Sequence, residues 1–350
     1  MDAKPAERAG GGVTARELAR MIGVSQSAVS RAFTPGASIS ADMRQRILAS
    51  AAKLGYRPNA IASSLSKRSS KLIGVVLPDL RNPFYPAFLE KLLLALEQAG
   101  HQGLVINGPP EGDMEDQLAG LTQYNIETVI IASARVSTAT ALNWSRNGRS
   151  ALLFNRPVAN VPVASVCCDN AAGARAIADH FNACGYRKVA YVAGPQDMPA
   201  NTIRQNAFIT RVAELGMTLS ACIVGGSYGY EIGHRHGVEA ARSGADAIFF
   251  ANDITALGGL DAIRDIAGLR VPEDIGVAGF DDITMASWPR HQLTTLRQPL
   301  DEMIAIAVEM LVNREGAQPL PPTMRLVAGE LVARNTTRTS ADGRSRSTAT

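Results

Sequence analysis

The chain has 350 residues, 46% of them hydrophobic, so it can form two or three domains with sizeable cores and is too apolar to be disordered throughout. No apolar run approaches the roughly 18 residues that span a bilayer. The polar start, Met1–Pro5, is followed by no hydrophobic signal segment, so we expect a cytoplasmic protein without membrane contact. The four cysteines show no C-x-x-C spacing, and we expect buried thiols.

The charge is divided unevenly along the chain. Residues 1–71 contain 12 Lys/Arg and 4 Asp/Glu, a net charge of +8. The remaining 279 residues contain 23 basic and 28 acidic residues, a net charge of −5. A basic head on an acidic body indicates that the head binds an anionic partner, either nucleic acid or a membrane surface.

After a flexible leader (1–12), residues 13–57 predict three short helices. Thr14 and Glu17 fit a capping box at the start of the first helix, which Gly23 ends. Ser25 is placed to cap a second helix over 26–33, and Ser40 a third that closes at Gly55. Two helices joined through a glycine turn are typical of a helix-turn-helix, although a small helical bundle has the same pattern.

Residues 58–71 form a Ser-rich, basic segment whose only large apolar residues are Ile61 and Leu65. Pro58 suits a first helical position, but so short a helix does not persist alone. We expect a hinge helix and linker that folds only with a partner.

From residue 72 the pattern changes to short apolar strands separated by helix-length segments, which predicts an α/β fold with parallel sheets covered by helices. About 260 residues exceed one simple doubly wound sheet, so we expect one domain of two lobes over 72–334, followed by a disordered tail at 335–350. The predicted strands are Ile73–Leu77, Leu104–Ile106, Val129–Ala132, Leu152–Phe154, Val189–Ala193, Cys222–Val224, Ala247–Ala251 and Ile275–Gly279.

The second predicted helix leaves four polar side chains outward: Gln26, Ser27, Ser30 and Arg31. A recognition helix presents such residues to base edges in the major groove, where glutamine pairs with adenine and arginine with guanine. Together with the basic charge, this face predicts DNA binding.

Several stretches resemble the LacI family of bacterial transcriptional regulators. In the head they are Val13–Ala19, Gly23–Arg31 and Leu54–Asn59. In the body they are Ile73–Val76, Asn82–Tyr85, Phe250–Asp253, Gly279–Asp282 and Leu293–Gln298.

The resemblance implies an all-α helix-turn-helix head and a two-lobed, periplasmic-binding-protein-like effector domain. The chain would cross between the lobes near Cys167, Arg297 and Met324. It further implies a homodimer that binds a pseudo-palindromic operator in double-stranded DNA, with a small-molecule effector, a carbohydrate or related polar metabolite, in the cleft. No leucine heptad follows residue 334, so we expect a dimer and not a coiled-coil tetramer. No cofactor or metal is expected.

By position, the resemblance also implies site residues. The DNA contacts would be Gln26, Ser27, Ser30, Arg31 and Asn59, with Leu65 entering the minor groove. The effector contacts would be Asn155, Arg204, Tyr228, Asn252, Asp281 and Gln298.

Two other functions fit parts of the sequence. Gly225–Gly229 matches the G-x-S-x-G motif of esterases, and Asp253 or Asp281 and then His291 follow in hydrolase order. No oxyanion segment of the His-Gly-Gly type precedes it, an esterase has no use for the basic head, and the resemblance places His291 in a stretch that links the lobes. A sugar-binding protein without gene control would share the body, but the N-terminal helices and the lack of a signal segment favour a regulator.

Overall fold

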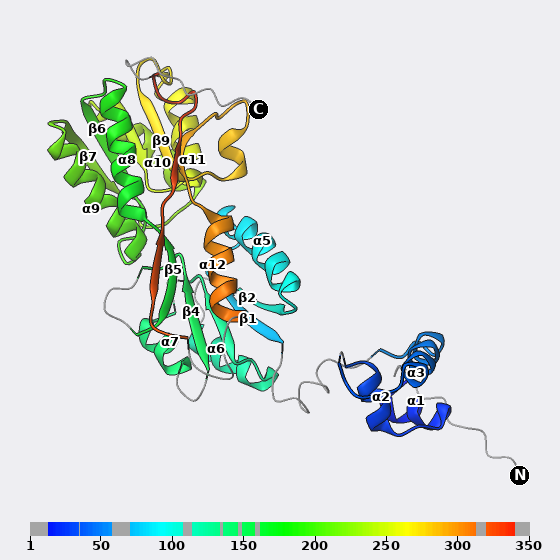
Figure 1. Cartoon of the computed structure of the whole chain (residues 1–350). Coiled ribbons are helices and arrows are strands. Elements are labelled where there is room, and N and C mark those ends of the chain that lie inside the picture. The colour runs from blue at the N-terminus through cyan, green and yellow to red at the C-terminus, as the bar shows by residue number, and fades with distance from the viewer. Residues whose placement is uncertain are drawn as a thin grey trace, which may run out of the picture. The chain divides into compact units, whose positions relative to one another are not determined.

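The computed structural model describes residues 13–34, 36–57, 71–107, 114–133, 136–145, 149–157, 162–312 and 320–339. The chain divides into two compact units, Met1–Ser70 and Lys71–Thr350 (Figure 1). The expected leader and the hinge residues 58–70, with Asn59 and Leu65, lie outside the described residues.

The first unit is a small three-helix head, formed by α1 (Ala15–Ile22), α2 (Gln26–Ala32) and α3 (Ala41–Lys53). The predicted capping box is confirmed: the Glu17 amide donates to Thr14 Oγ1 over 3.2 Å, and the Thr14 amide donates to the Glu17 carboxylate over 2.9 Å. Gly23 ends α1 with φ 69°, the left-handed conformation that glycine adopts without strain. The buried core of the head consists of Leu18, Ala19, Val29, Ala32, Ile47 and Ala51.

The second unit contains two six-stranded sheets, one in each lobe. The first sheet has the strand order β11-β5-β4-β3-β1-β2 and is parallel throughout. Its strands are β1 (Leu72–Leu77), β2 (Gln102–Asn107), β3 (Thr128–Ile131), β4 (Ser150–Phe154), β5 (Ala164–Cys168) and β11 (Met324–Val327).

The second sheet has the order β12-β10-β9-β8-β6-β7, and only its edge strand β12 runs antiparallel. Its strands are β6 (Lys188–Ala193), β7 (Thr218–Val224), β8 (Ala247–Phe250), β9 (Gly276–Asp281), β10 (Thr294–Arg297) and β12 (Glu330–Val332). The expected α/β architecture with parallel sheets is thus confirmed, with one antiparallel edge added.

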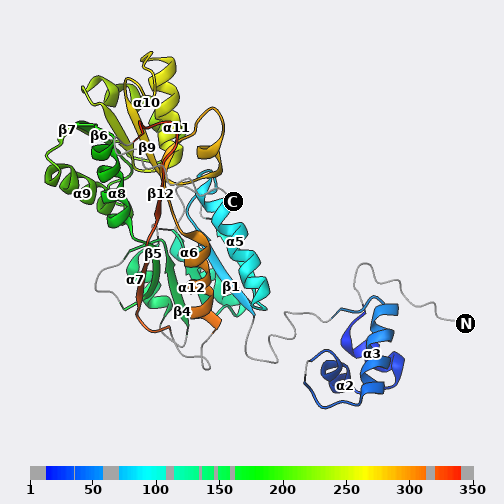
Figure 2. The ribbon, with the colours of Figure 1, turned by 45° about the horizontal axis from the view of Figure 1, so that its top comes forward.

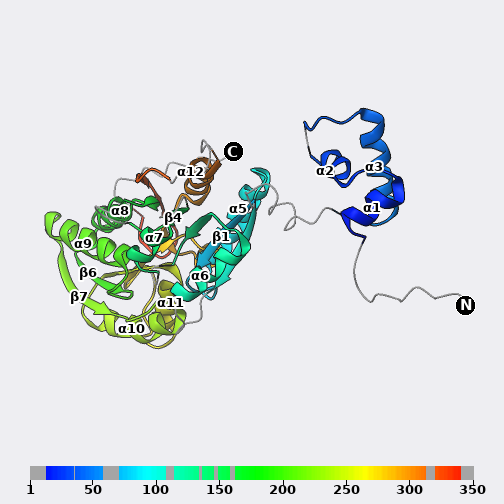
Figure 3. The same ribbon diagram turned by 90° about the horizontal axis from the view of Figure 1, so that it is seen from below.

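Helices cover both sheets. In the first lobe, α5 and α12 lie side by side (Figures 1 and 2). In the second lobe, β6 and β7 lie between the pair α8 and α9 and the pair α10 and α11 (Figure 3). The helices of this unit are α5 (Phe84–Gln98), α6 (Met114–Gly120), η1 (Leu121–Tyr124), α7 (Thr138–Trp144), α8 (Asn170–Ala183), α9 (Pro199–Glu214), α10 (Tyr230–Arg242), α11 (Asp253–Asp265), η2 (Thr284–Ser287) and α12 (Leu300–Val312).

The chain crosses between the lobes three times, within a few residues of the expected places. The crossings join β5 to α8, β10 to α12 and β11 to β12. The last one is visible as the red segment that runs from one lobe to the other (Figure 1). Sequence patterns did not predict β5, β10, β11 or β12, since each is only three to five residues long and has no clear hydrophobic alternation.

The expectation of a disordered tail from residue 335 is wrong for its first part. Thr336 is fully buried and pairs with both β9 and β10: its hydroxyl donates to the Val277 carbonyl and accepts from the Thr294 amide, each over 2.8 Å. The polar composition suggested disorder, but threonine hydroxyls here supply hydrogen bonds that the sheet needs. Residues 340–350 lie outside the described residues.

Replacing Thr336 by valine keeps the side-chain shape and leaves the Thr294 amide and the Val277 carbonyl without their buried partner. We expect the free energy of unfolding of the body to fall by at least about 2 kcal/mol, measured by urea titration. The matched control is Thr218→Val on the exposed edge strand β7. Equal effects of the two substitutions would contradict this role of Thr336.

Candidate functional site

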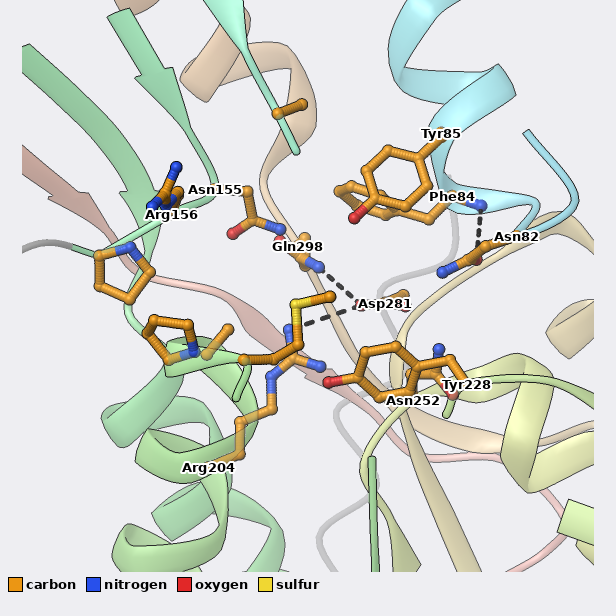
Figure 4. A pocket seen from close by; sticks show the side chains of 15 residues that line it. Asn82, Phe84, Tyr85, Asn155, Arg156, Arg204, Tyr228, Asn252, Asp281 and Gln298 are labelled. Carbon is orange, nitrogen blue, oxygen red and sulfur yellow. Dashed lines mark hydrogen bonds and ion pairs between the residues drawn. The ribbon is translucent and has the colours of Figure 1, made fainter. Parts of the chain in front are cut away.

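A pocket that is partly open to solvent lies where the two lobes meet (Figure 4). All six residues expected to contact an effector line it: Asn155, Arg204, Tyr228, Asn252, Asp281 and Gln298. The structure therefore brings these residues together, and their role as ligand contacts stays a prediction.

The strands explain why these side chains converge. Asn155 follows β4, Asn252 follows β8, and Asp281 is the last residue of β9. Parallel strands present their carboxyl ends at one edge of a sheet, which is where open α/β sheets bind ligands. Gln298 stands on the second interlobe crossing, directly after β10.

Arg204 is a buried cation of the pocket, with 4% of its surface exposed. Its Nε donates to Asn170 Oδ1 over 2.7 Å, and its Nη1 donates to the Ala251 carbonyl over 2.6 Å. Its Nη2 lies 3.7 Å from Asp281 Oδ1, and the guanidinium lies 3.6 Å from the centroid of the Phe280 ring. Two of its nitrogens are thus fixed by the protein, while Nη2 faces the carboxylate.

Asp281 also accepts a 2.6 Å hydrogen bond from Gln298 Nε2. This bond defines the orientation of the Gln298 amide, because a carboxylate only accepts. Gln298 Oε1 is consequently a buried acceptor, and it has no hydrogen-bond partner among the described residues. Burial raises the pKa of Asp281, although the Arg204 guanidinium acts in the opposite direction.

Asn155 and Asn252 differ in whether the side-chain oxygen already accepts a hydrogen bond from the protein. Asn252 caps α11, since its Oδ1 accepts from the Thr255 amide over 3.2 Å. Asn155 has a left-handed backbone with φ 52°, and its buried Oδ1 has no hydrogen-bond partner within the described part of the chain. Asn155 therefore offers a second unpaired acceptor to a molecule in the pocket.

Tyr228 packs its ring against Gly194. A Cβ at residue 194 would lie 2.1 Å from the Tyr228 ring, so glycine is required there for this placement. Burial raises the pKa of the Tyr228 phenol to about 12, which keeps it neutral.

Sequence reasoning missed nine of the lining residues, among them Asn82, Phe84, Tyr85 and Arg156. The first three follow the carboxyl end of β1, the same signal that pointed to Asn252 and Asp281, and could have been found by it. Arg156 stands two residues after β4 and carries the same signal. Only the tertiary structure reveals that its guanidinium donates to the Val136 carbonyl and to the Ser133 carbonyl.

A second carboxylate, Asp253, lies fully buried behind the pocket. It accepts from Thr295 Oγ1 over 2.5 Å and from the Ile283 amide over 2.9 Å, and it lies close against Gly279. Burial, reinforced by the nearby charge of Asp281, raises the pKa of Asp253 well above that of a free aspartate.

The head presents a second candidate site. Gln26, Ser27, Ser30 and Arg31 are all exposed on α2, as expected, while Val29 and Ala32 of the same helix are buried. Arg31 Nε donates to the Ser27 carbonyl over 3.3 Å, which aligns the arginine along the helix. One face of α2 is therefore free to contact a nucleic acid.

The residues of the esterase pattern do not form a triad. His291 Nδ1 lies 3.0 Å from the Met285 carbonyl oxygen, and His291 Nε2 lies 4.0 Å from Asp261. This histidine stands between η2 and β10 inside the second lobe, so the expectation that it links the lobes is wrong. Within the described ranges, no group of three His, Cys, Asp or Glu could hold a metal, and no helix is long and apolar enough to cross a membrane.

Comparisons with known proteins agree on one family. The model for bacterial regulatory proteins of the lacI family matches residues 14–59, and the periplasmic binding protein-like domain matches residues 178–337. The HTH-type transcriptional regulator GalS of Salmonella typhimurium is 30% identical over 305 residues, which cover 86% of this chain and 89% of GalS.

Two solved structures are also similar. The Lac repressor dimer bound to operator and the anti-inducer ONPF matches 94% of this chain and 100% of its own, with a TM-score of 0.84 and 26% identity. The complex of the transcriptional regulator CelR with cellobiose matches 92% of this chain and 99% of its own, with a TM-score of 0.66 and 25% identity.

The raised pKa of Asp253 predicts a pH dependence of stability. The native carboxyl holds its proton at pH values where the unfolded one has lost it, so the free energy of unfolding falls as pH rises above about 4 toward the native pKa. Asp253→Asn reduces this slope, by at most about 1.4 kcal/mol per pH unit, because an asparagine can accept from the Ile283 amide and donate to Thr295 Oγ1. The raised pKa of Asp281 leaves a smaller slope of the same sign.

The measurement is urea unfolding between pH 5 and pH 8. Asp274→Asn is the control: Arg270 lowers the pKa of Asp274 to about 2, so its ionisation is complete throughout this range. We expect wild type and Asp274→Asn to share a slope that is steeper than that of Asp253→Asn. Parallel curves for all three proteins would contradict the protonation of Asp253.

Proposed function

The chain belongs to the LacI family and is a DNA-binding transcriptional regulator, not an enzyme; from this premise we propose that it is a repressor whose operator binding is controlled by a carbohydrate in the interlobe pocket. The observation that carries the effector proposal is the pair of buried, unpaired acceptors, Asn155 Oδ1 and Gln298 Oε1, in that pocket. Buried polar atoms ordinarily have partners, so these two mark where a ligand donates hydrogen bonds.

The charges around Arg204 favour a neutral ligand group at that point of the pocket. An anionic group bound at Arg204 would meet the carboxylate of Asp281, which lies 3.7 Å from Arg204 Nη2. A hydroxyl avoids this repulsion, because it can accept from the guanidinium and donate to an amide oxygen at the same time. The rings of Phe84, Tyr85 and Tyr228 add the apolar surface against which the carbon face of a sugar packs.

The same pocket is suited to control. Its lining comes from both lobes and from the second crossing, so a bound molecule interacts differently with different lobe orientations. Only such differential affinity can shift a conformational equilibrium. We propose that the shift reaches DNA through residues 58–70, with Leu65 as a minor-groove wedge. Bound cellobiose in the related CelR structure supports a carbohydrate effector.

We propose that the protein occupies its operator as a dimer. The face formed by α5 and the edge strand β2 exposes two large apolar side chains, Leu94 and Val105, which are 54% and 36% accessible. Such a face is suited to pairing with a second copy of the chain. The related Lac repressor, which is a dimer bound to operator in its solved structure, supports the same assembly.

The DNA prediction concerns the symmetry of the operator. A dimer with one α2 in each subunit should protect a pseudo-palindrome whose half-sites are about one helical turn apart, as footprinting of a duplex selected from a random pool would reveal. Gln26→Ala and Arg31→Ala should each weaken operator binding by about 1–3 kcal/mol and relax base preference at one position per half-site. Protection of a single asymmetric half-site would contradict the dimer.

The effector prediction concerns charge. In thermal-shift and calorimetric titrations we expect neutral sugars such as D-glucose, D-ribose or cellobiose to include a binder, and the anions gluconate and glucose 6-phosphate to bind more weakly. Gln298→Leu should reduce the affinity for the binder at least about tenfold, since one buried hydrogen bond is lost, without weakening operator binding.

The matched control for this variant is Gln123→Leu, an exposed glutamine in η1 outside the pocket. Its affinity for the sugar should equal that of wild type. Tighter binding of the anions, or unchanged sugar affinity in Gln298→Leu, would overturn the proposed effector site.

A further inference from the structure

Two arginines of the head donate hydrogen bonds to backbone carbonyls of the head itself. Arg44, on α3, donates from Nη1 to the Ala32 carbonyl over 3.1 Å and from Nη2 to the carbonyls of Thr34 and Ala37, each over 3.2 Å. Arg46, on the same helix, donates to the Ile22 carbonyl at the end of α1 over 2.9 Å. The third helix thus binds the carboxyl ends of both other helices.

The end of α2 depends on these bonds. A helix leaves its last carbonyls without partners, and those carbonyls carry the negative end of the helix dipole. Arg44 satisfies the carbonyl of the last residue of α2 and two carbonyls of the following loop, and it brings a positive charge to the same place.

Apolar packing also orients this helix. The helix has seven residues, too few to be stable alone, and it buries only Val29 and Ala32 completely. Ala28 and Phe33 pack against the core of the head, and the Phe33 ring lies edge-on to the Tyr56 ring, with their centroids 5.6 Å apart. At the same helix end, the Thr34 hydroxyl donates to the Ser30 carbonyl over 2.9 Å. A loss of the Arg44 contacts would leave the helix formed by its Ser25 cap but free to change its angle to α3.

We infer that Arg44 is a positioning residue for sequence-specific DNA binding: its guanidinium joins α3 to the end of α2 and so fixes the angle at which Gln26, Ser27 and Arg31 meet the bases. The inference rests on the proposed role of α2 as the reading helix. The simpler expectation for a basic residue of the head is a phosphate contact.

Substitution distinguishes a residue that positions α2 from one that contacts a phosphate. A phosphate contact tolerates lysine, which binds phosphate as a point charge, and its removal lowers the salt dependence of binding because fewer counterions are released. A guanidinium that donates to three carbonyls in two directions has no substitute in lysine, whose single ammonium cannot reproduce the planar fork.

The experiment compares Arg44→Lys and Arg44→Met with wild type in the full-length protein. Affinity is measured by fluorescence anisotropy at several salt concentrations, on an operator duplex selected from a random pool by the wild-type protein and on a scrambled duplex. Lys53→Met is the matched control, since Lys53 ends the same helix and is exposed. Far-UV circular dichroism reports the helix content of each variant.

We expect Arg44→Lys to lose at least tenfold in operator affinity, to stay within threefold of wild type on the scrambled duplex, and to keep the salt slope and the helix content. Arg44→Met should lose operator affinity by at least the same factor, whereas Lys53→Met should keep the ratio of operator to scrambled affinity.

Two results would overturn the inference. If Arg44→Lys retains operator affinity while Arg44→Met lowers the salt slope, Arg44 contacts phosphate. If both variants lose affinity equally on both duplexes and lose helix content, Arg44 only stabilises the head. Gln26→Ala and Arg31→Ala are measured in parallel. If neither weakens operator binding, α2 is not the reading helix, and the proposed DNA contacts fail together with this inference. If either weakens operator binding while Arg44→Lys has no effect, this inference alone fails.

Discussion

The buried ion pair between Arg204 and Asp281 is the interaction on which the interlobe region depends. A buried guanidinium is tolerated only when its charge is compensated and its donors are bonded. Here the compensation comes from Asp281, and the bonds go to Asn170 and Ala251. Because Asn170 begins α8 at the first crossing and Gln298 bonds Asp281 at the second, this single pair connects two of the three crossings.

Asp282, which follows Asp281 in the chain, connects the same region to the third crossing. Asp282 accepts from Arg297 Nε over 2.7 Å and from Arg334 Nη2 over 2.6 Å, and Arg297 also reaches Glu330 over 3.2 Å. Arg297 ends β10 before the second crossing, and Glu330 begins β12 after the third. Both aspartates have positive φ, 126° at Asp281 and 56° at Asp282, a conformation that costs energy and persists only where surrounding contacts hold it. The pocket and the crossings are therefore parts of one polar network.

Different interactions stabilise the head and the body. The body buries two large sheets, and its polar network is added to an extensive apolar core. The head buries only six residues completely among those described, so side-chain caps carry more of its organisation. Ser25 and Ser40 cap the beginnings of α2 and α3, and Arg44 binds the end of α2. A small domain of this kind is sensitive to individual hydrogen bonds, since its hydrophobic contribution is limited.

The sequence by itself determined the local elements and the family. Thr14, Ser25 and Ser40 predicted three helix starts because an N-cap bond is made within four residues. Asn155, Asn252 and Asp281 could be assigned to the carboxyl ends of strands, Asn155 in the first sheet and the other two in the second, and Gln298 and Arg204 came from the family resemblance. Contacts between distant segments were beyond such reasoning. The guanidinium of Arg156 contacts a loop about 20 residues away, Arg44 reaches back over 12 residues to α2, and Thr336 completes strands some 40 and 60 residues before it. Only the tertiary structure decided these long-range hydrogen bonds. A buried polar group needs a partner, and the partner's position in the sequence follows no regular spacing from which it could be predicted.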